Sequence, residues 1–143
     1  MDAVHLVVGL TVLAANIAAG GWGAWAWVRH EPAVGFWYVL RFAQVAVVGQ
    51  VMIGAVLLLL GRAAADLHYL YGVLPILVSL TAEAIRSGAA DRELEGLDFD
   101  SLPKARQGAI ALAIVRRETG IMAVSALIIV FLALRAAAST PFL

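Results

Sequence analysis

Hydrophobic residues fill four long stretches of this chain, and shorter polar segments separate them. The stretches cover about residues 3–28, 36–60, 66–87 and 118–135. As an α-helix rising 1.5 Å per residue, the first would be about 39 Å long, whereas the hydrocarbon core of a bilayer is about 30 Å thick. The pattern therefore predicts an all-α integral membrane protein. Its single domain, residues 1–143, is expected to be a bundle of four transmembrane helices.

The polar segments predict where these helices end. Arg29–Pro32 closes the first stretch, because proline cannot continue a helix and charges beside tryptophans mark a membrane surface. Gly61–Asp66 is predicted to be a short turn. The longest polar segment, residues 88–117, should begin as an acidic solvated loop over 88–103 and continue as an amphipathic helix.

The composition narrows the class of protein. The chain is 63% hydrophobic and 14% charged, with a mean hydropathy of +0.93, which exceeds what a soluble domain carries. The absence of cysteine excludes disulfides, cysteine zinc sites, iron–sulfur clusters and c-type haem attachment. Zero net charge without a basic run argues against a nucleic-acid partner. No hydrolase triad, phosphate loop or HExxH motif is present, so an electron carrier or accessory protein is expected rather than a catalyst.

The basic residues predict an orientation in the membrane. Arg62 and Arg135 fall on one side, and the other eight basic residues fall on the other: Arg29, Arg41, Arg86, Arg92, Lys104, Arg106, Arg116 and Arg117. Because cytoplasmic segments carry the excess of Lys and Arg, both termini should face outward. The first stretch is too long for a removable signal peptide. The richness in Ala, Val, Gly and Arg, with a single Lys, favours the plasma (inner) membrane of a bacterium.

Two parts of the chain resemble each other. His5 precedes Gly9 by four residues, as His68 precedes Gly72, and the segments LLLLGRAAAD (57–66) and VFLALRAAAS (130–139) align Arg62 with Arg135. This pattern predicts two helical hairpins related by a rough two-fold axis along the membrane normal, the parallel-repeat arrangement. The two histidines would then lie at the same depth.

Helical spacing places both histidines on packed faces. The stripe from His5 carries glycines and Asn16, and the stripe from His68 carries Ser79 and Glu83, and polar or small residues in lipid face other helices. A haem b between the first and third helices would use His5 and His68 as axial ligands. Gly9 and Gly72 would leave space for the macrocycle. The propionates would be paired by Arg62, Arg135 and Tyr69.

This layout is similar to that of the small membrane b-type cytochromes, which are four-helix proteins with paired histidines. The likeness covers the layout and His5 and His68, and it implies electron transfer through one haem, since a two-haem member would need four inward histidines. Two alternatives stay open. One is a cofactor-free accessory or assembly subunit of a larger membrane complex, in which each histidine is an interface residue near a helix end that hydrogen-bonds headgroups or a neighbouring carbonyl. The other is a zinc or copper site formed by the two histidines with Asp66 and Asp2.

A second group of polar residues is predicted near the cytoplasmic surface: Arg41, Gln44, Glu83 and Glu118. Charges at this depth pair with each other or serve a function. The group could bind an anion, carry a proton or hold a quinone headgroup, as in a small transporter or a protein with a quinone or other redox partner. The favoured alternative is a structural layer of ion pairs. Besides the lipid bilayer, the expected partners include a second copy of the chain or a larger membrane complex.

Overall fold

The structure is a computed structural model that describes residues 3–62 and 64–139. Within these residues the chain forms four α-helices: α1 (Ala3–Arg29), α2 (Val34–Leu59), α3 (Asp66–Leu94) and α4 (Lys104–Ala138). A short 3-10 helix, η1 (Phe99–Ser101), lies between α3 and α4. All four α-helices are long and apolar enough to cross a membrane, which confirms that part of the prediction.

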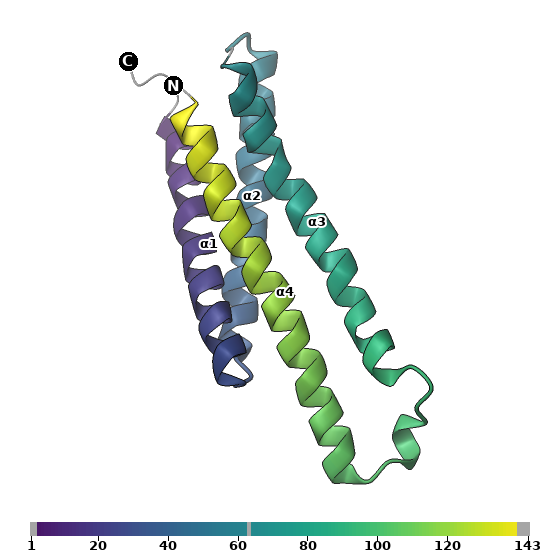
Figure 1. Cartoon of the computed structure of the whole chain (residues 1–143). Helices are drawn as coiled ribbons and strands as arrows, with labels where there is room; N and C mark the ends of the chain where they lie inside the picture. The colour runs from purple at the N-terminus through teal and green to yellow at the C-terminus, as the bar shows by residue number, and fades with distance from the viewer. Residues whose placement is uncertain (1–2, 63, 140–143) are drawn as a thin grey trace.

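The helices form an elongated bundle in which α4 is central (Figure 1). α4 packs against both α3 and α1, α1 packs against α2, and contacts between α2 and α3 are sparse. The start of α1, the α2–α3 connection and the end of α4 lie at one end of the bundle, which we call the terminal end. The α1–α2 connection and η1 lie toward the other end, which we call the loop end.

The long polar segment is more helical than the sequence predicts. α3 continues through Gly88 to Leu94, so the first part of the expected loop is helix. Ala89 is fully buried, and Glu93 forms an ion pair with Arg117 of α4. These contacts hold the added turns of α3 against α4. The predicted amphipathic helix and the fourth span form one uninterrupted helix of 35 residues, and Figure 1 shows α3 and α4 extending beyond α1 and α2.

Two apolar layers form the core between the ends of the bundle. The layer nearer the terminal end contains Val12, Val47 and Ile129. The layer nearer the loop end contains Ala19, Phe36, Leu40, Ala82, Met122 and Ala126. Each layer draws residues from several helices, so together they tie the bundle into one unit.

Small residues let α1 approach its neighbours closely. A Cβ atom on Gly20 would lie 2.6 Å from the Leu127 side chain of α4, and one on Gly23 would lie 2.5 Å from the Phe36 ring of α2. Such contacts matter because helices in lipid gain their association energy from close packing and not from hydrophobic exclusion of water. Large apolar side chains elsewhere, such as Leu59 and Val45, face outward, as lipid-facing positions require.

Candidate functional site

The structure brings His5 and His68 together at the terminal end. His5 lies in the first turn of α1 and His68 in the first turn of α3, and 63 positions separate them in the sequence. Their ring centroids are 6.0 Å apart, with the ring planes tilted by 55°. α1 and α3 do not pack along their lengths, so the approach of the two rings is a local feature of this end.

His5 is buried, with 7% of its surface exposed, and its ring lies beside Gln50 and Gly54 of α2. The amide nitrogen of Gln50 lies 3.2 Å from Nε2 of His5. A Cβ atom on Gly54, one helical turn further along α2, would lie 3.5 Å from the ring carbon Cε1. The absence of a side chain at position 54 therefore makes room for the imidazole. We call His5, Gln50 and His68 the histidine layer.

His68 is oriented by the end of α4. Its Nδ1 lies 3.0 Å from the carbonyl oxygen of Ala136. Because a carbonyl only accepts hydrogen bonds, Nδ1 must carry the proton, and the neutral ring then has a lone pair on Nε2. Histidines that ligate metals commonly donate their other ring N–H to a backbone carbonyl in this way. The Tyr69 ring meets His68 edge-on, with centroids 6.2 Å apart.

The other residues predicted to surround a haem differ in how closely they are packed. Gln50 occupies the space beside Gly9, where an added Cβ would meet its amide nitrogen at 3.1 Å, whereas Gly72 has no neighbour within 4 Å of the same position. The Tyr69 hydroxyl accepts a hydrogen bond of 2.7 Å from the backbone N–H of Ala64. Two arginines also lie at the terminal end. Arg62 is exposed in the α2–α3 connection, and the Arg135 guanidinium lies over the ring of Tyr71.

Within the described part of the chain, the histidine pair has no third metal ligand beside it. Among the described residues, no three His, Asp or Glu side chains gather where they could hold a metal ion. Asp66 is exposed at the start of α3, and Asp2 lies outside the described residues. The histidine layer therefore offers two imidazoles and no carboxylate.

At the loop end, the structure brings together the second predicted group. Arg41 of α2 forms an ion pair with Glu83 of α3 and donates a 2.6 Å hydrogen bond to Gln44. The Gln44 amide in turn donates to Glu83 at 2.9 Å. These contacts bridge the α2–α3 seam, where the two helices otherwise touch little.

Arg86 connects this group to Glu118, and it was not among the predicted site residues. Its guanidinium donates to Glu83 at 2.9 Å and to Glu118 of α4 at 3.5 Å, and it lies over the Trp37 ring at 5.6 Å. We call Arg41, Gln44, Glu83, Arg86 and Glu118 the charge layer. Its two cations and two carboxylates cancel, so the layer is neutral overall. Arg86 follows Glu83 by three residues on the same helical face, and this spacing could have predicted that it belongs to the group.

Gln50 is the other residue that was not among the predicted site residues. Its partner is His5 on a different helix, and the stripe pattern of one helix does not reveal which residue of another helix it meets.

No model of a protein family matches this chain, and no curated protein and no solved structure is detectably similar to it.

Proposed function

We propose that this protein is a small membrane electron carrier that holds one haem b between α1 and α3, with His5 and His68 as axial ligands. The observation that carries the proposal is the 6.0 Å separation of the two imidazole rings. In a cofactor-free accessory subunit, the two histidines need not approach each other.

At this separation, His5 and His68 would both be able to hold one haem iron. The hydrogen bond from His68 Nδ1 to Ala136 leaves Nε2 of that ring as the ligand atom. His5 approaches from α1, so the two rings enter from different helices, as axial ligands in helical bundles do.

Haem suits this pair better than a bare ion. A tetrahedral zinc site needs three or four protein ligands, whereas haem supplies four nitrogens itself and needs only the two axial positions. With both axial positions filled by histidine, the iron has no open site for substrate. The bound haem would supply reversible one-electron chemistry, and the protein would set its environment.

Haem binding would require local movement. The Gln50 amide sits at Nε2 of His5 and fills the space at Gly9, so its side chain would rotate away when the iron takes that nitrogen. The sparse contacts between α2 and α3 would let the macrocycle enter there, and Gly72 of α3 has no neighbour within 4 Å of an added Cβ. Arg62 and Arg135 at the same end would pair with the propionates, with Tyr69 beside His68.

The proposed setting is the plasma membrane of a bacterium, with both termini outside. The excess of basic residues at the loop end supports this orientation. The haem would then lie near the outer leaflet, within reach of an outward-facing redox partner or a quinone in the membrane. We also retain the proposal that the α1–α2 and α3–α4 hairpins derive from a parallel repeat, supported by the matched pairs His5/His68 and Arg62/Arg135.

The transporter alternative would place its site in the charge layer. There Glu83 already accepts hydrogen bonds from three side chains, and the four charges pair with one another. This mutual pairing favours a structural role for the charge layer.

The test is a visible spectrum of protein expressed with ample haem, recorded oxidised and then reduced with dithionite. We expect the sharp reduced band of low-spin haem b, lost in both His5→Ala and His68→Ala. The matched control is His30→Asn, since His30 is exposed and its φ of 59° is one that asparagine tolerates. A colourless wild type, or a spectrum that survives loss of either inner histidine, would refute the proposal and favour the accessory subunit.

A further inference from the structure

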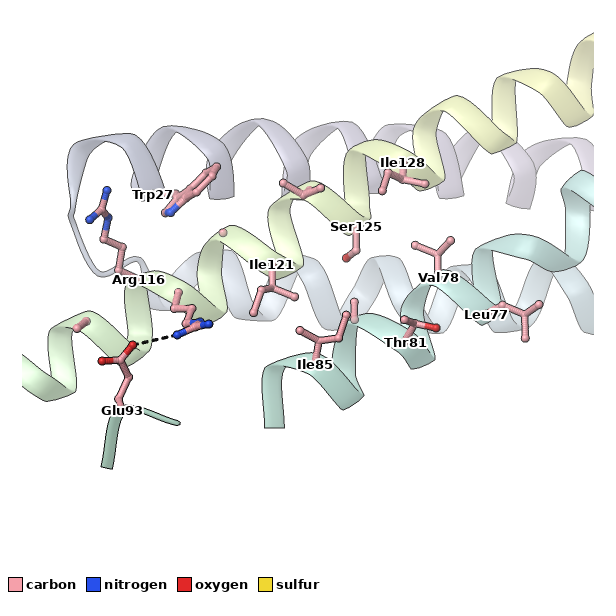
Figure 2. A pocket seen from close by; sticks show the side chains of 15 residues that line it. Trp27, Leu77, Val78, Thr81, Ile85, Glu93, Arg116, Ile121, Ser125 and Ile128 are labelled. Atoms are coloured by element: carbon pink, nitrogen blue, oxygen red, sulfur yellow. Dashed lines mark hydrogen bonds and ion pairs between the residues drawn. The ribbon is translucent and has the colours of Figure 1, made fainter. Parts of the chain in front are cut away.

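A groove runs along α3 and α4, away from the histidine layer. Its volume is about 930 Å³, near the upper end of the range for small-molecule sites. Figure 2 shows side chains of both helices along it and Trp27 of α1 at one end. Several side chains line the groove: Leu77, Thr81 and Ile85 from α3, and Ile121, Val124 and Ile128 from α4.

The groove has the length of one membrane leaflet. Along α4 the lining runs from Ala113 to Ile128, fifteen positions apart, which corresponds to about 22 Å along a helix axis. One leaflet with its headgroup region is about 20–22 Å thick. The groove therefore reaches from the level of the lipid headgroups to about the middle of the membrane.

The two ends of the groove differ in chemistry. At the loop end it is bordered by Arg116 and Arg117, and toward the middle of the bundle it is lined by aliphatic residues such as Val124 and Ile128. The Arg117 guanidinium pairs with Glu93 at 3.1 Å, as the dashed line in Figure 2 marks. Arg116 forms no ion pair with any described residue. Its charge is therefore available to an anion from outside the chain.

Trp27 indicates the depth in the membrane at which this charged end of the groove lies. Its indole fills the space beside Gly120, where an added Cβ would meet the ring at 2.7 Å. Tryptophan side chains favour the headgroup region of a bilayer. Arg116 precedes Gly120 by one helical turn toward the loop end, which puts its guanidinium at the depth of lipid phosphates.

From these observations we propose that the groove binds one anionic phospholipid, with its phosphate at Arg116 and an acyl chain along α3 and α4. Basic pockets between transmembrane helices are known to take anionic lipid headgroups. An anionic phospholipid matches the groove because the groove is apolar, has the length of one leaflet and ends at a cation that has no ion-pair partner among the described residues. The site is separate from the histidine layer, so the inference does not depend on haem binding.

The test is lipid retention measured by native mass spectrometry after mixing detergent-solubilised protein with phosphatidylglycerol or with phosphatidylcholine. We expect one phosphatidylglycerol to stay bound and phosphatidylcholine to be retained less. Arg116→Gln should weaken phosphatidylglycerol retention about fivefold, the effect of one basic side chain near a membrane surface. The control Arg106→Gln, on the same helix but outside the groove, should match the wild type.

A second variant tests the apolar part of the groove. Val124→Trp adds a large side chain at a position that is 45% exposed, so the protein should fold but retain little of either lipid. Equal retention of the two lipids by the wild type would overturn the proposal. So would equal losses in the Arg116 and Arg106 variants, or unchanged retention in Val124→Trp. A mass corresponding to a lipid-free dimer would show instead that a second copy of the chain covers the groove.

Discussion

The two ends of the bundle each carry a polar layer, and the layers satisfy their polar atoms differently. In the charge layer, the carboxylate of Glu83 accepts from Arg41, Gln44 and Arg86. In the histidine layer, the oxygen of Gln50 is buried with no hydrogen-bond partner among the described residues. A buried polar atom without a partner costs about 1–3 kcal/mol. The comparison indicates that the charge layer is complete as it stands, whereas the histidine layer keeps a cost that a ligand could offset.

The charge layer has the character of a structural element. Its charges are paired with one another, hold α2, α3 and α4 together, and require no ligand. The two imidazoles of the histidine layer, with centroids 6.0 Å apart, carry nitrogen atoms that can bind a metal. Changes in the charge layer should therefore be felt mainly as lost stability, and changes in the histidine layer mainly as altered haem binding.

The largest stability effect should come from Glu83→Ala. The change leaves Arg41 and Arg86 without their shared acceptor. The free energy of unfolding should fall by about 2 kcal/mol, less than the about 3–5 kcal/mol for a fully buried pair, because the Glu83 side chain is 27% exposed. Unfolding in mixed micelles, followed by circular dichroism, measures the change. Glu95→Ala is the control, since Glu95 is exposed, and equal stability of the two variants would show that the charge layer does not hold the helices together.

Matched glutamine variants at the two ends sharpen the contrast. Gln44→Leu removes a donor to Glu83 and should cost about 1 kcal/mol, with no change in haem content. Gln50→Leu removes the partnerless oxygen and also the amide contact with Nε2 of His5. The two effects on stability should offset each other, and haem loading should rise. Haem content per protein and unfolding curves measure both variants. Loss of haem in Gln50→Leu would mean that Gln50 supports the haem site and does not merely occupy it.

Glu118→Gln should have a smaller effect than Glu83→Ala. Its one ion pair, with Arg86, spans 3.5 Å, and Arg86 keeps its closer contact with Glu83. We expect a loss of about 0.5 kcal/mol, typical of a partly exposed pair, measured by the same unfolding assay. A loss as large as that of Glu83→Ala would place the centre of the charge layer at Glu118.

The smallest effect should come from Gly54→Ala. The new methyl group would lie 3.5 Å from the His5 ring, which is ordinary van der Waals contact. Stability should change by less than about 0.5 kcal/mol, and the haem spectrum should be unchanged. Gly49→Ala, on the same helix with no neighbour within 4 Å, is the matched control. A shifted spectrum in Gly54→Ala alone would show that α2 controls the orientation of the His5 ring.

The sequence predicted the coarse fold because hydrophobic length alone identifies spanning helices. It misjudged the end of α3, since the helix past Gly88 depends on contacts of Ala89 and Glu93 with another helix. Helix ends in polar segments depend on such tertiary contacts, and a pattern along one segment does not contain them.

Part of the site could also be predicted. The matched stripes predicted that His5 and His68 lie at one depth on packed faces, and the haem hypothesis added that the two rings come together. Their surroundings were not predictable. His68 bonds the backbone carbonyl of residue 136, and because every residue has such a carbonyl, the sequence does not identify the acceptor. If Arg62 is aligned with Arg135, residues 50 and 54, which lie beside His5, correspond to residues 123 and 127. His68, however, contacts residue 136. The α1–α2 and α3–α4 pairs are therefore packed in different registers, which the repeat pattern could not indicate.

The most direct test of the central claim is the electron paramagnetic resonance spectrum of the oxidised, haem-loaded protein. Iron held by two imidazoles is low-spin, so the account predicts a low-spin ferric signal in the wild type. It predicts a high-spin signal or loss of haem in His5→Ala and in His68→Ala. A high-spin wild type would show that only one histidine reaches the iron, and a protein that binds no haem would contradict the proposed function itself.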